Sequence, residues 1–249
     1  MSLKQGTRRA LFRGGGGGRG YQGKVLATGP IAYWMLNETS GLVAYDQIRS
    51  AQNGAHTGVT LGQAGIGDGR TSPLYDGAND YTNVHSAAFV AAFNGSAGTV
   101  MCWARMSGAG VWTDGTFRAA VRLTADGNNY IHIARGAVNN RLGLLYVAGG
   151  AVKDVLLDGL TATGWMHFAL TWDKNAGGTG EVAGYYNGTQ SGATLVNLGV
   201  WAGALSAVST CIGSVTTVPA NVWSGYIAHC AVWDRALSPA EIADLYVVE

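Results

Sequence analysis

The sequence is poor in charge: 12% of its 249 residues are Asp, Glu, Lys or Arg, where an average soluble domain has about a quarter. Its three cysteines are too few for a disulfide-built scaffold, and we expect Cys102, Cys211 and Cys230 to be small buried hydrophobic residues. No run of about 18 apolar residues is free of Gly, Ser or Asn, which excludes a membrane-spanning helix. No N-terminal hydrophobic segment with a cleavage site is present, so we expect no Sec signal peptide.

Hydrophobic residues, in contrast, make up 47% of the chain, with 8 Trp and 11 Tyr. This composition excludes disorder for most of the chain, and the length fits one large all-β domain. Charge is distributed unevenly, because six of the 16 cations precede Glu38, the first acid. The remaining ten cations face 15 acids, so a basic segment of +6 is followed by a body of −5.

Residues 1–29 include five consecutive glycines, Gly14 to Gly18, and we expect an extended basic arm there because such a backbone loses too much entropy to fold alone. Residues 30–249 are expected to form one domain. The glycine run lacks the Gly-Lys-Ser/Thr ending of a phosphate loop, so it is not expected to bind a nucleotide. We expect neither nucleic acid nor a membrane as a partner of the chain. The arm is expected to attach the chain to other protein subunits through Lys4, Arg8, Arg9, Phe12, Arg13, Arg19, Tyr21 and Lys24.

From residue 30 onward, short segments with period-two alternation predict β-strands separated by Gly, Asn and Asp turns. In residues 165–172, Met166, Phe168, Leu170 and Trp172 predict a dry face, and Trp165, His167, Ala169 and Thr171 a wet one. Residues 99–106 and 130–133 alternate similarly, and Asn187-Gly188 predicts a two-residue hairpin turn. The pattern is typical of antiparallel hairpins.

One helix is expected at the C-terminus, where Ser238, Pro239 and Glu241 form the pattern of a capping box. Residues 87–93 predict a further short helical turn. Between Glu181 and Asp234, 52 residues contain no Asp, Glu, Lys or Arg. That stretch predicts a wide uncharged surface, which either invites contact or is merely neutral.

Five blocks in this order resemble the laminin-G-like, concanavalin A-type jelly roll, over most of residues 31–248. The most specific block is the last, where a Gly-Tyr-Ile strand leads into Trp-Asp-Arg-Ala-Leu-Ser-Pro-Ala-Glu-Ile. The blocks are residues 32–41 with Asp46, residues 74–81, residues 99–103, residues 165–173 with 185–188, and residues 225–242 with Tyr246. The resemblance implies an all-β, two-sheet antiparallel jelly-roll sandwich with a short C-terminal helix.

Members of this family include extracellular lectin-like modules, glycan-processing enzymes and bacteriophage surface proteins, and the fold alone does not choose among them. Where the family often has Asp-Glu after the closing Gly-x-Ile, this chain has Ala228-His229. That difference counts against a metal or charge role at this position.

An enzyme is not expected, because a retaining glycosidase on this fold needs two nearby carboxylates and none of the four glutamates has an acid two residues away. No Gly-x-Ser-x-Gly elbow is present. The histidines occur singly, which disfavours zinc. No cofactor is expected; calcium is an alternative at two loops, although their Asp and Asn are also typical turn residues: Asp76, Asn79 and Asp80, and Asp126, Asn128 and Asn129.

Trp112 and Trp201 are the candidate platform for stacking on a sugar ring, whereas Trp34, Trp103 and Trp172 are expected in the core. Our leading hypothesis is a non-catalytic structural or adhesion subunit of a larger assembly, such as a capsid decoration or fibre-type protein on a bacteriophage virion. We expect capsid or other virion proteins and further copies of the chain as partners, surface glycans as candidate ligands, and a location on the virion or outside the cell. The alternative is a free glycan-binding lectin, with or without calcium; a glycan-cleaving enzyme with distant carboxylates ranks third.

Overall fold

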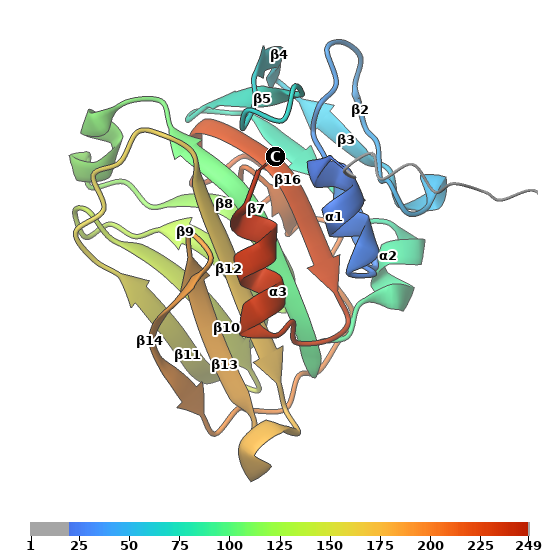
Figure 1. Ribbon diagram of the computed structural model, residues 1–249, viewed down its shortest axis with the longest axis vertical. Helices are drawn as coiled ribbons and strands as arrows, with labels where there is room; N and C mark the ends of the chain where they lie inside the picture. Colours follow the sequence, from blue (N-terminus) through green and yellow to red (C-terminus); the bar gives the residue numbers. More distant parts are fainter. Residues whose placement is uncertain (1–19, 249) are drawn as a thin grey trace, which may run out of the picture.

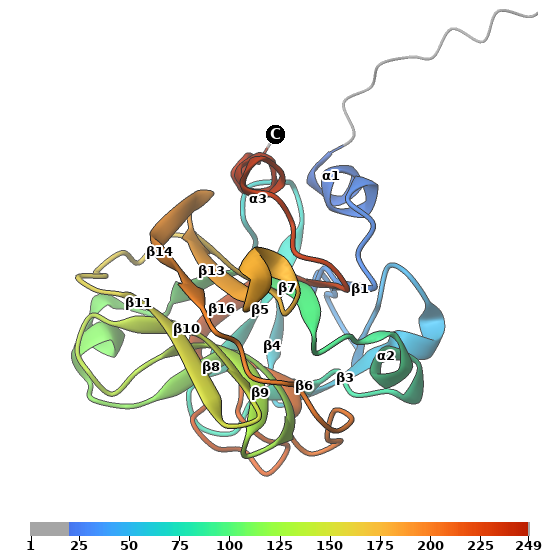
Figure 2. The ribbon, with the colours of Figure 1, turned by 90° about the horizontal axis from the view of Figure 1, so that it is seen from below.

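The computed structural model describes residues 20–248, which form three layers: two helices, a first β-sheet and a second β-sheet (Figures 1 and 2). The two sheets pack face to face as an antiparallel sandwich, with the main hydrophobic core between them. The predicted all-β, two-sheet sandwich is therefore confirmed. None of the helices in residues 20–248 is long and apolar enough to cross a membrane.

The sheet nearer the helices, called sheet A here, contains eight strands. Its long central strands β7 and β16 pair with each other, and the short strand β1 pairs with β16 outside the main order. In spatial order the strands are β14 (Thr189–Val196), β13 (Glu181–Tyr186), β12 (Met166–Asp173), β7 (Ala97–Met106), β16 (Ser224–Trp233), β5 (Thr71–Asp76) and β4 (Thr60–Ala64), with β1 (Ala32–Trp34) beside β16.

The other sheet, sheet B, also contains eight strands. Four consecutive long strands, β8 to β11, form a meander of hairpins at one end. The full order is β11 (Ala151–Leu157), β10 (Leu142–Ala148), β9 (Asn129–Arg135), β8 (Arg118–Asp126), β15 (Thr210–Ile212), β6 (Tyr81–Asn83), β3 (Gly54–Thr57) and β2 (Val43–Ala44). Three single 3-10 turns lie in loops, at Ser50–Gln52, Ala109–Thr113 and Ala176–Gly178.

Helix α3 (Pro239–Tyr246) and helix α1 (Tyr21–Ala27) lie side by side on the outer face of sheet A (Figure 2). A second hydrophobic core fills the space between these helices and the sheet. The prediction of a wet face on β12 is therefore wrong. Met166 to Trp172 are all buried, and His167 has no exposed surface, because α3 covers the side of β12 that turns away from the main core.

Helix α1 also changes the expected domain boundary. Residues 1–29 were expected to form an extended arm, but Tyr21–Ala27 are helical and two of them are buried, with Tyr21 1% exposed and Val25 fully buried. Their spacing of four residues places both side chains on one face of the helix. Helix α1 packs this face against its own subunit, in the second hydrophobic core. The folded domain thus begins near Gly20, and Met1–Arg19 lie outside the described residues.

Several local predictions are confirmed. Ser238 accepts a hydrogen bond from the backbone of Glu241, whose side chain accepts one from Ser238 in return, so α3 begins with a complete capping box. Asn187 and Gly188 both have positive φ angles, 49° and 77°, as the tight turn between β13 and β14 requires. Helix α2 (Ala87–Ala92) matches the short predicted turn and closes one end of the main core with Phe89.

Candidate functional site

The outer face of sheet B carries no helix among the described residues, in contrast to the outer face of sheet A (Figure 2). Strands β8 to β11 alternate, so that Ile131, Ile133 and Leu144 point into the main core while His132 and Leu145 point away from it. An uncovered sheet face beside a well-packed core is a rigid surface for a ligand.

A hollow of about 280 Å³ opens on this face, and we call it the sheet B hollow. Its floor is apolar and combines small residues with two leucines, and polar side chains stand at its sides. It is lined by Phe117, His132, Ala134, Gly136, Arg141, Gly143, Leu145, Asp154 and Leu156. The combination of an apolar floor with a few polar groups is typical of small-ligand sites.

The polar groups of the hollow follow from strand register. Leu145 on β10 pairs with His132 on β9 and with Asp154 on β11, so His132 and Asp154 stand on either side of an apolar centre. The next row along the same strands is Ala134, Gly143 and Leu156. Gly143 leaves space there, since a Cβ atom on it would lie 2.8 Å from Oδ1 of Asp154. The carboxylate of Asp154 therefore lies over the floor of the hollow.

The carboxylate of Asp154 is an unused hydrogen-bond acceptor. No described residue donates a hydrogen bond to it. Its partial burial raises the pKa of this carboxyl, and the positive charge of Arg141 partly opposes that rise. A carboxylate without a partner at the edge of an apolar floor can accept hydrogen bonds from the hydroxyl groups of a ligand.

His132, on the other side of Leu145, is a neutral hydrogen-bond donor. Burial lowers the pKa of its ring to about 3, and the nearby charge of Arg122 lowers it further, so the ring is uncharged near neutral pH. Arg122 lies 3.0 Å from Nδ1, and because a guanidinium can only donate, Nδ1 accepts this bond. The ring proton is then on Nε2, and no described residue accepts from that atom.

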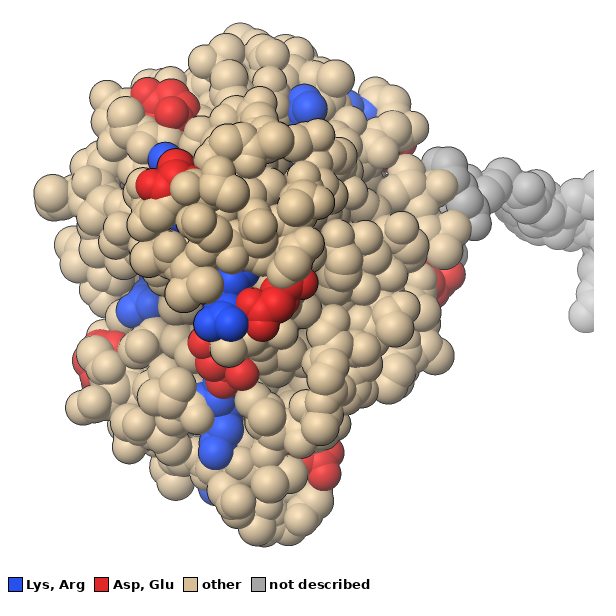
Figure 3. Space-filling model, turned by 90° about the vertical axis from the view of Figure 1, so that its left-hand side faces the viewer, with Lys and Arg blue, Asp and Glu red and all other residues tan. Residues whose placement is uncertain are grey.

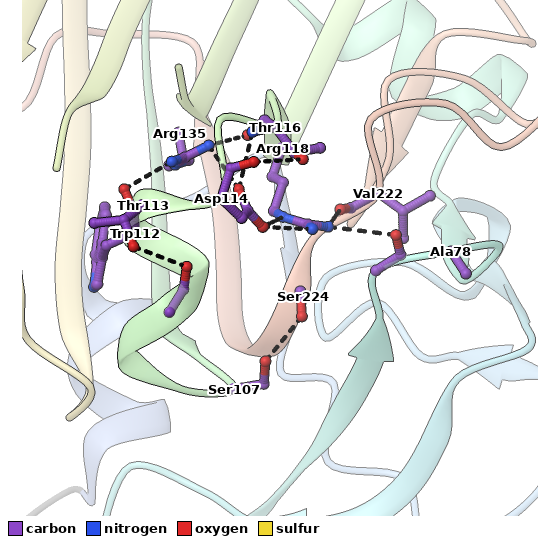
Figure 4. Close-up of polar contacts among 12 residues, drawn as sticks. Ala78, Ser107, Trp112, Thr113, Asp114, Thr116, Arg118, Arg135, Val222 and Ser224 are labelled. Carbon is purple, nitrogen blue, oxygen red and sulfur yellow. Dashed lines mark hydrogen bonds and ion pairs between the residues drawn. The ribbon is translucent and has the colours of Figure 1, made fainter. Parts of the chain in front are cut away.

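Phe117 forms the aromatic wall of the hollow, with its ring centroid 5.5 Å from that of His132. Its backbone is held by an ion-pair cluster in the loop before β8 (Figure 4). Asp114 pairs with Arg118 at 2.7 Å and with the buried Arg135 at 3.0 Å, and Arg135 also donates to the carbonyl of Thr116. Thr116 and Arg118 flank Phe117, so the cluster fixes the position of the wall.

The same cluster resolves an electrostatic problem in the sheet. Arg118 and Arg135 occupy directly opposed positions on β8 and β9, where like charges destabilise a strand pair. Asp114 lies between them. Burial alone would raise the pKa of its carboxyl, but the N–H of Thr116 and the two guanidinium groups together hold that pKa below its usual value. Asp114 therefore stays charged and offsets the repulsion.

Beyond this cluster, charged groups are sparse on the side of the molecule where β11 and β14 form the sheet edges. Figure 3 shows separate small clusters of acidic and basic side chains with wide uncharged areas between them. At the rim of the hollow, Arg141 pairs with Asp158 at 2.5 Å. The exposed residues of β14 are all uncharged, as the charge-free stretch of the sequence predicts.

The structure separates the two tryptophans that were expected to form a glycan platform. Trp112 is 1% exposed, and its Nε1 donates to the carbonyl of Ala162 at 2.8 Å, so its ring faces are not accessible and the prediction is wrong for this residue. Trp201 is half-buried and packs against Phe93 and Tyr146. Neither residue lines the sheet B hollow.

The two loops considered for calcium use their acids in the turns themselves. Asp76 accepts hydrogen bonds from the backbone of Ala78 and Asn79, and Asp126 accepts from Asn128 and Asn129. Residues 20–248 contain no group of three or more His, Cys, Asp or Glu side chains suited to hold a metal ion. Calcium binding at these loops stays a prediction.

The cysteines are buried, as expected, and they are unpaired. Of the residues expected to attach the chain to an assembly, Tyr21 and Lys24 lie on α1. Tyr21 packs beneath that helix, and Lys24 pairs with Asp244 on α3 at 3.7 Å. Both therefore contact their own subunit. Lys4, Arg8, Arg9, Phe12, Arg13 and Arg19 lie outside the described residues.

Together, the two-sheet sandwich, the C-terminal capped helix and the open outer face define a lectin-like jelly roll. Residues 76–243 match the laminin G-type family described as the concanavalin A-like lectin/glucanases superfamily. This match covers more than half of the sequence, and the chain belongs to that family. No curated protein matches it.

Solved structures of low sequence identity share the fold. Domain 4 of AbnA, an extracellular arabinanase of Geobacillus stearothermophilus in complex with arabinotriose, is 18% identical with a TM-score of 0.60, and the alignment covers 88% of this chain and 98% of that domain. The receptor-binding domain of botulinum neurotoxin mosaic serotype C/D is 13% identical with a TM-score of 0.65, covering 87% of this chain and 50% of that one.

A third similar structure is the sialidase of Trypanosoma rangeli in complex with sialic acid, which is 14% identical with a TM-score of 0.60. The alignment covers 86% of this chain and 32% of the sialidase. The chain thus spans about half of the toxin domain and about a third of the sialidase. At these identities the comparisons show the fold alone.

The sequence interpretation missed Phe117, His132 and Asp154 as site residues. Alternation over residues 130–133 places His132 opposite Ile131 and Ile133, which is the one local signal that it turns away from the core. The pairing of β9, β10 and β11 brings Asp154 near His132, and the loop that contains Asp114 brings Phe117 near it. Such non-local proximity is not visible in a single sequence.

Proposed function

We propose that this chain is a non-catalytic carbohydrate-binding domain and that the sheet B hollow is its binding site. One observation carries the proposal: the unpartnered carboxylate of Asp154 faces the N–H donor of His132 across the apolar side chain of Leu145. A sugar ring presents apolar C–H groups between hydroxyls that both donate and accept. The hollow offers the complementary set of groups in the same order.

The wall and rim extend this complementarity. Phe117 supplies an aromatic surface against which the C–H face of a sugar packs, and Arg141 supplies further donors at the rim. The volume of about 280 Å³ lies just below the range of about 300–1,000 Å³ typical of small-ligand sites and suits a short saccharide segment. Two of the similar structures were solved in complex with saccharides, arabinotriose and sialic acid, which supports the ligand class.

The composition of the hollow favours binding over hydrolysis. Glycoside hydrolysis uses a pair of carboxylates, about 5–5.5 Å or 6.5–9.5 Å apart, on either side of the scissile bond. Among the described residues that line the hollow, Asp154 is the single acid. With one carboxylate the site can hold a sugar but lacks the second group for either mechanism.

The proposal is tested by titrating the full chain with arabinotriose and a panel of neutral oligosaccharides in a calorimeter. We expect at least one to bind. Asp154→Asn should weaken that binding tenfold or more, since hydrogen bonds to a charged group contribute about 1.5–3 kcal/mol, and His132→Ala should weaken it severalfold, since a hydrogen bond from a neutral donor contributes about 0.5–1.5 kcal/mol. Asp234→Asn is the matched control, because Asp234 is exposed and lies outside the hollow.

Binding that survives both substitutions would place the site elsewhere, and a panel without any binder would contradict the function. Chromatography of the same mixtures tests the non-catalytic part of the proposal: we expect the oligosaccharides to remain intact, and cleavage products would overturn it.

A basic segment is still predicted to attach this domain to a virion or another assembly. The predicted segment is now limited to residues 1–19, which lie outside the described residues. The proposed attachment rests on the six charged or aromatic residues named for that role before Gly20, while α1 belongs to the folded domain. In this arrangement the segment would attach the domain and the sheet B hollow would face outward. Removal of residues 1–19 should abolish assembly while leaving saccharide binding unchanged.

A further inference from the structure

A second group of aromatic and charged side chains lies on the outer face of sheet A. Trp165, Arg105 and Tyr226 occupy neighbouring positions at β12, β7 and β16: Tyr226 pairs directly with Arg105, and Trp165 precedes Met166, the partner of Ala104. All three side chains are partly exposed. They face the opposite direction from the sheet B hollow, because the two sheets present their outer faces on opposite sides of the sandwich (Figure 2).

The guanidinium of Arg105 is held in place by the two rings. Its Cζ lies 3.7 Å from the centroid of the Tyr226 ring and 5.4 Å from the Trp165 ring. The two rings are 6.4 Å apart at an angle of 64°. Cation–π contacts of this kind orient a guanidinium without using its N–H groups in conventional hydrogen bonds. The charge of Arg105 is thus positioned in advance of any ligand.

Arg105 has no acidic partner and no hydrogen-bond acceptor among the described residues. Its Nε atom is buried without a partner. Other arginines of the domain behave differently, since Arg118, Arg141 and Arg235 each pair with a carboxylate at 2.5–2.7 Å. The domain therefore contains one arginine that is fixed by aromatic rings while its Nη groups are left without protein acceptors.

We propose that Trp165, Arg105 and Tyr226, which we call the Arg105 site, form a second binding site for an acidic saccharide. The guanidinium would form paired hydrogen bonds with a carboxylate or sulfate on the sugar, and the aromatic rings beside it would pack against the ring of the same sugar. The Arg105 site shares no residue with the sheet B hollow. A chain with both sites could bind two segments of glycan on opposite faces.

The test titrates the full chain with a hyaluronan tetrasaccharide, which carries carboxylates, with a chondroitin sulfate tetrasaccharide, which adds sulfate, and with neutral chitotetraose. We expect an acidic probe to bind, and we expect Arg105→Met to weaken this binding at least tenfold. Arg105→Lys keeps the charge but loses the planar pair of donors, so its affinity for the acidic probe should lie between those of the wild type and Arg105→Met. Comparison of the two acidic probes distinguishes carboxylate from sulfate recognition.

Arg49→Met is the matched control, because Arg49 is an exposed arginine on a different part of the chain and its replacement makes the same change in net charge. Asp154→Asn should leave binding of the acidic probe unchanged, so a failure of this proposal is distinguishable from a failure of the sheet B hollow. The proposal is overturned if neither acidic probe binds, if Arg105→Met binds like the wild type, or if Arg49→Met weakens binding equally.

Discussion

The hydroxyl of Tyr21 donates a hydrogen bond to the backbone carbonyl of Leu245 at 2.8 Å and accepts one from Nε1 of Trp103 at 2.7 Å. One side chain thus joins α1, α3 and the centre of sheet A. Burial raises the pKa of this phenol far above its usual value, so the hydroxyl stays protonated and able to donate. The two ends of the described chain are therefore coupled through a buried contact.

This contact predicts that two N-terminal truncations differ in stability. Removal of residues 1–19 should leave the free energy of unfolding unchanged, whereas removal of residues 1–29 should lower it by several kcal/mol. Truncation of one large buried aromatic side chain alone costs about 3–5 kcal/mol. Urea denaturation followed by tryptophan fluorescence measures both. Equal midpoints for the two truncations would show that α1 contributes nothing to the fold.

A second prediction concerns a buried chain of hydrogen bonds beside α1. His229 lies 2.6 Å from the hydroxyl of Tyr33 through Nδ1 and 3.0 Å from Asp68 through Nε2. Burial alone would raise the pKa of the Asp68 carboxyl, but the hydrogen bond and charge of His229 and the N–H of Arg70 hold it below its usual value. The folded state therefore binds the Asp68 proton less tightly than the unfolded state does.

The stabilisation from Asp68 is accordingly present above its unfolded pKa, near 4, and is lost as the pH falls through the lower folded value. Asp68→Asn should lower the free energy of unfolding at pH 7 by about 1–3 kcal/mol, and the difference from wild type should shrink between about pH 5 and pH 2. Urea midpoints across this range measure it. Asp234→Asn is the control; a difference that stays constant with pH would contradict the assigned role of Asp68.

A third prediction links the Asp114 cluster to the sheet B hollow. Asp114→Asn removes no group that lines the hollow, but it weakens the two ion pairs that position the loop carrying Phe117. The saccharide affinity of Asp114→Asn should be severalfold lower than that of the wild type, and the affinity of Phe117→Ala should be lower still. If Asp114→Asn binds as tightly as the wild type, the loop is positioned by other contacts.

The fourth prediction concerns thiol reactivity. All three cysteines are buried, and burial raises the pKa of Cys211 to about 12 and those of Cys102 and Cys230 further above their usual value. Because the thiolate is the reactive form, none should react with DTNB at pH 8 in the folded chain, and all three should react in guanidinium. Fast reaction of a native thiol would reveal local opening of a sheet.

Local sequence signals predicted the individual elements well and their surroundings poorly. The alternation of β12 identified Phe168 and Trp172 as core residues, but its other face was expected to be wet because the docking of helix α3 over that face is a non-local contact that the strand's own sequence does not show. Tyr21 and Val25, four residues apart, were the available sign of an amphipathic turn. Trp112 was expected to stack on a sugar as an aromatic residue of a loop, whereas its 3-10 turn folds it into the core.

The central claim, that the outer face of β8 to β11 binds saccharide, is tested most directly by mapping amide chemical shifts. In a ¹H–¹⁵N titration with an oligosaccharide that binds, we predict shifts that cluster on the backbone around His132, Leu145 and Asp154. Shifts confined to another surface, with these amides unmoved at saturation, would contradict the account.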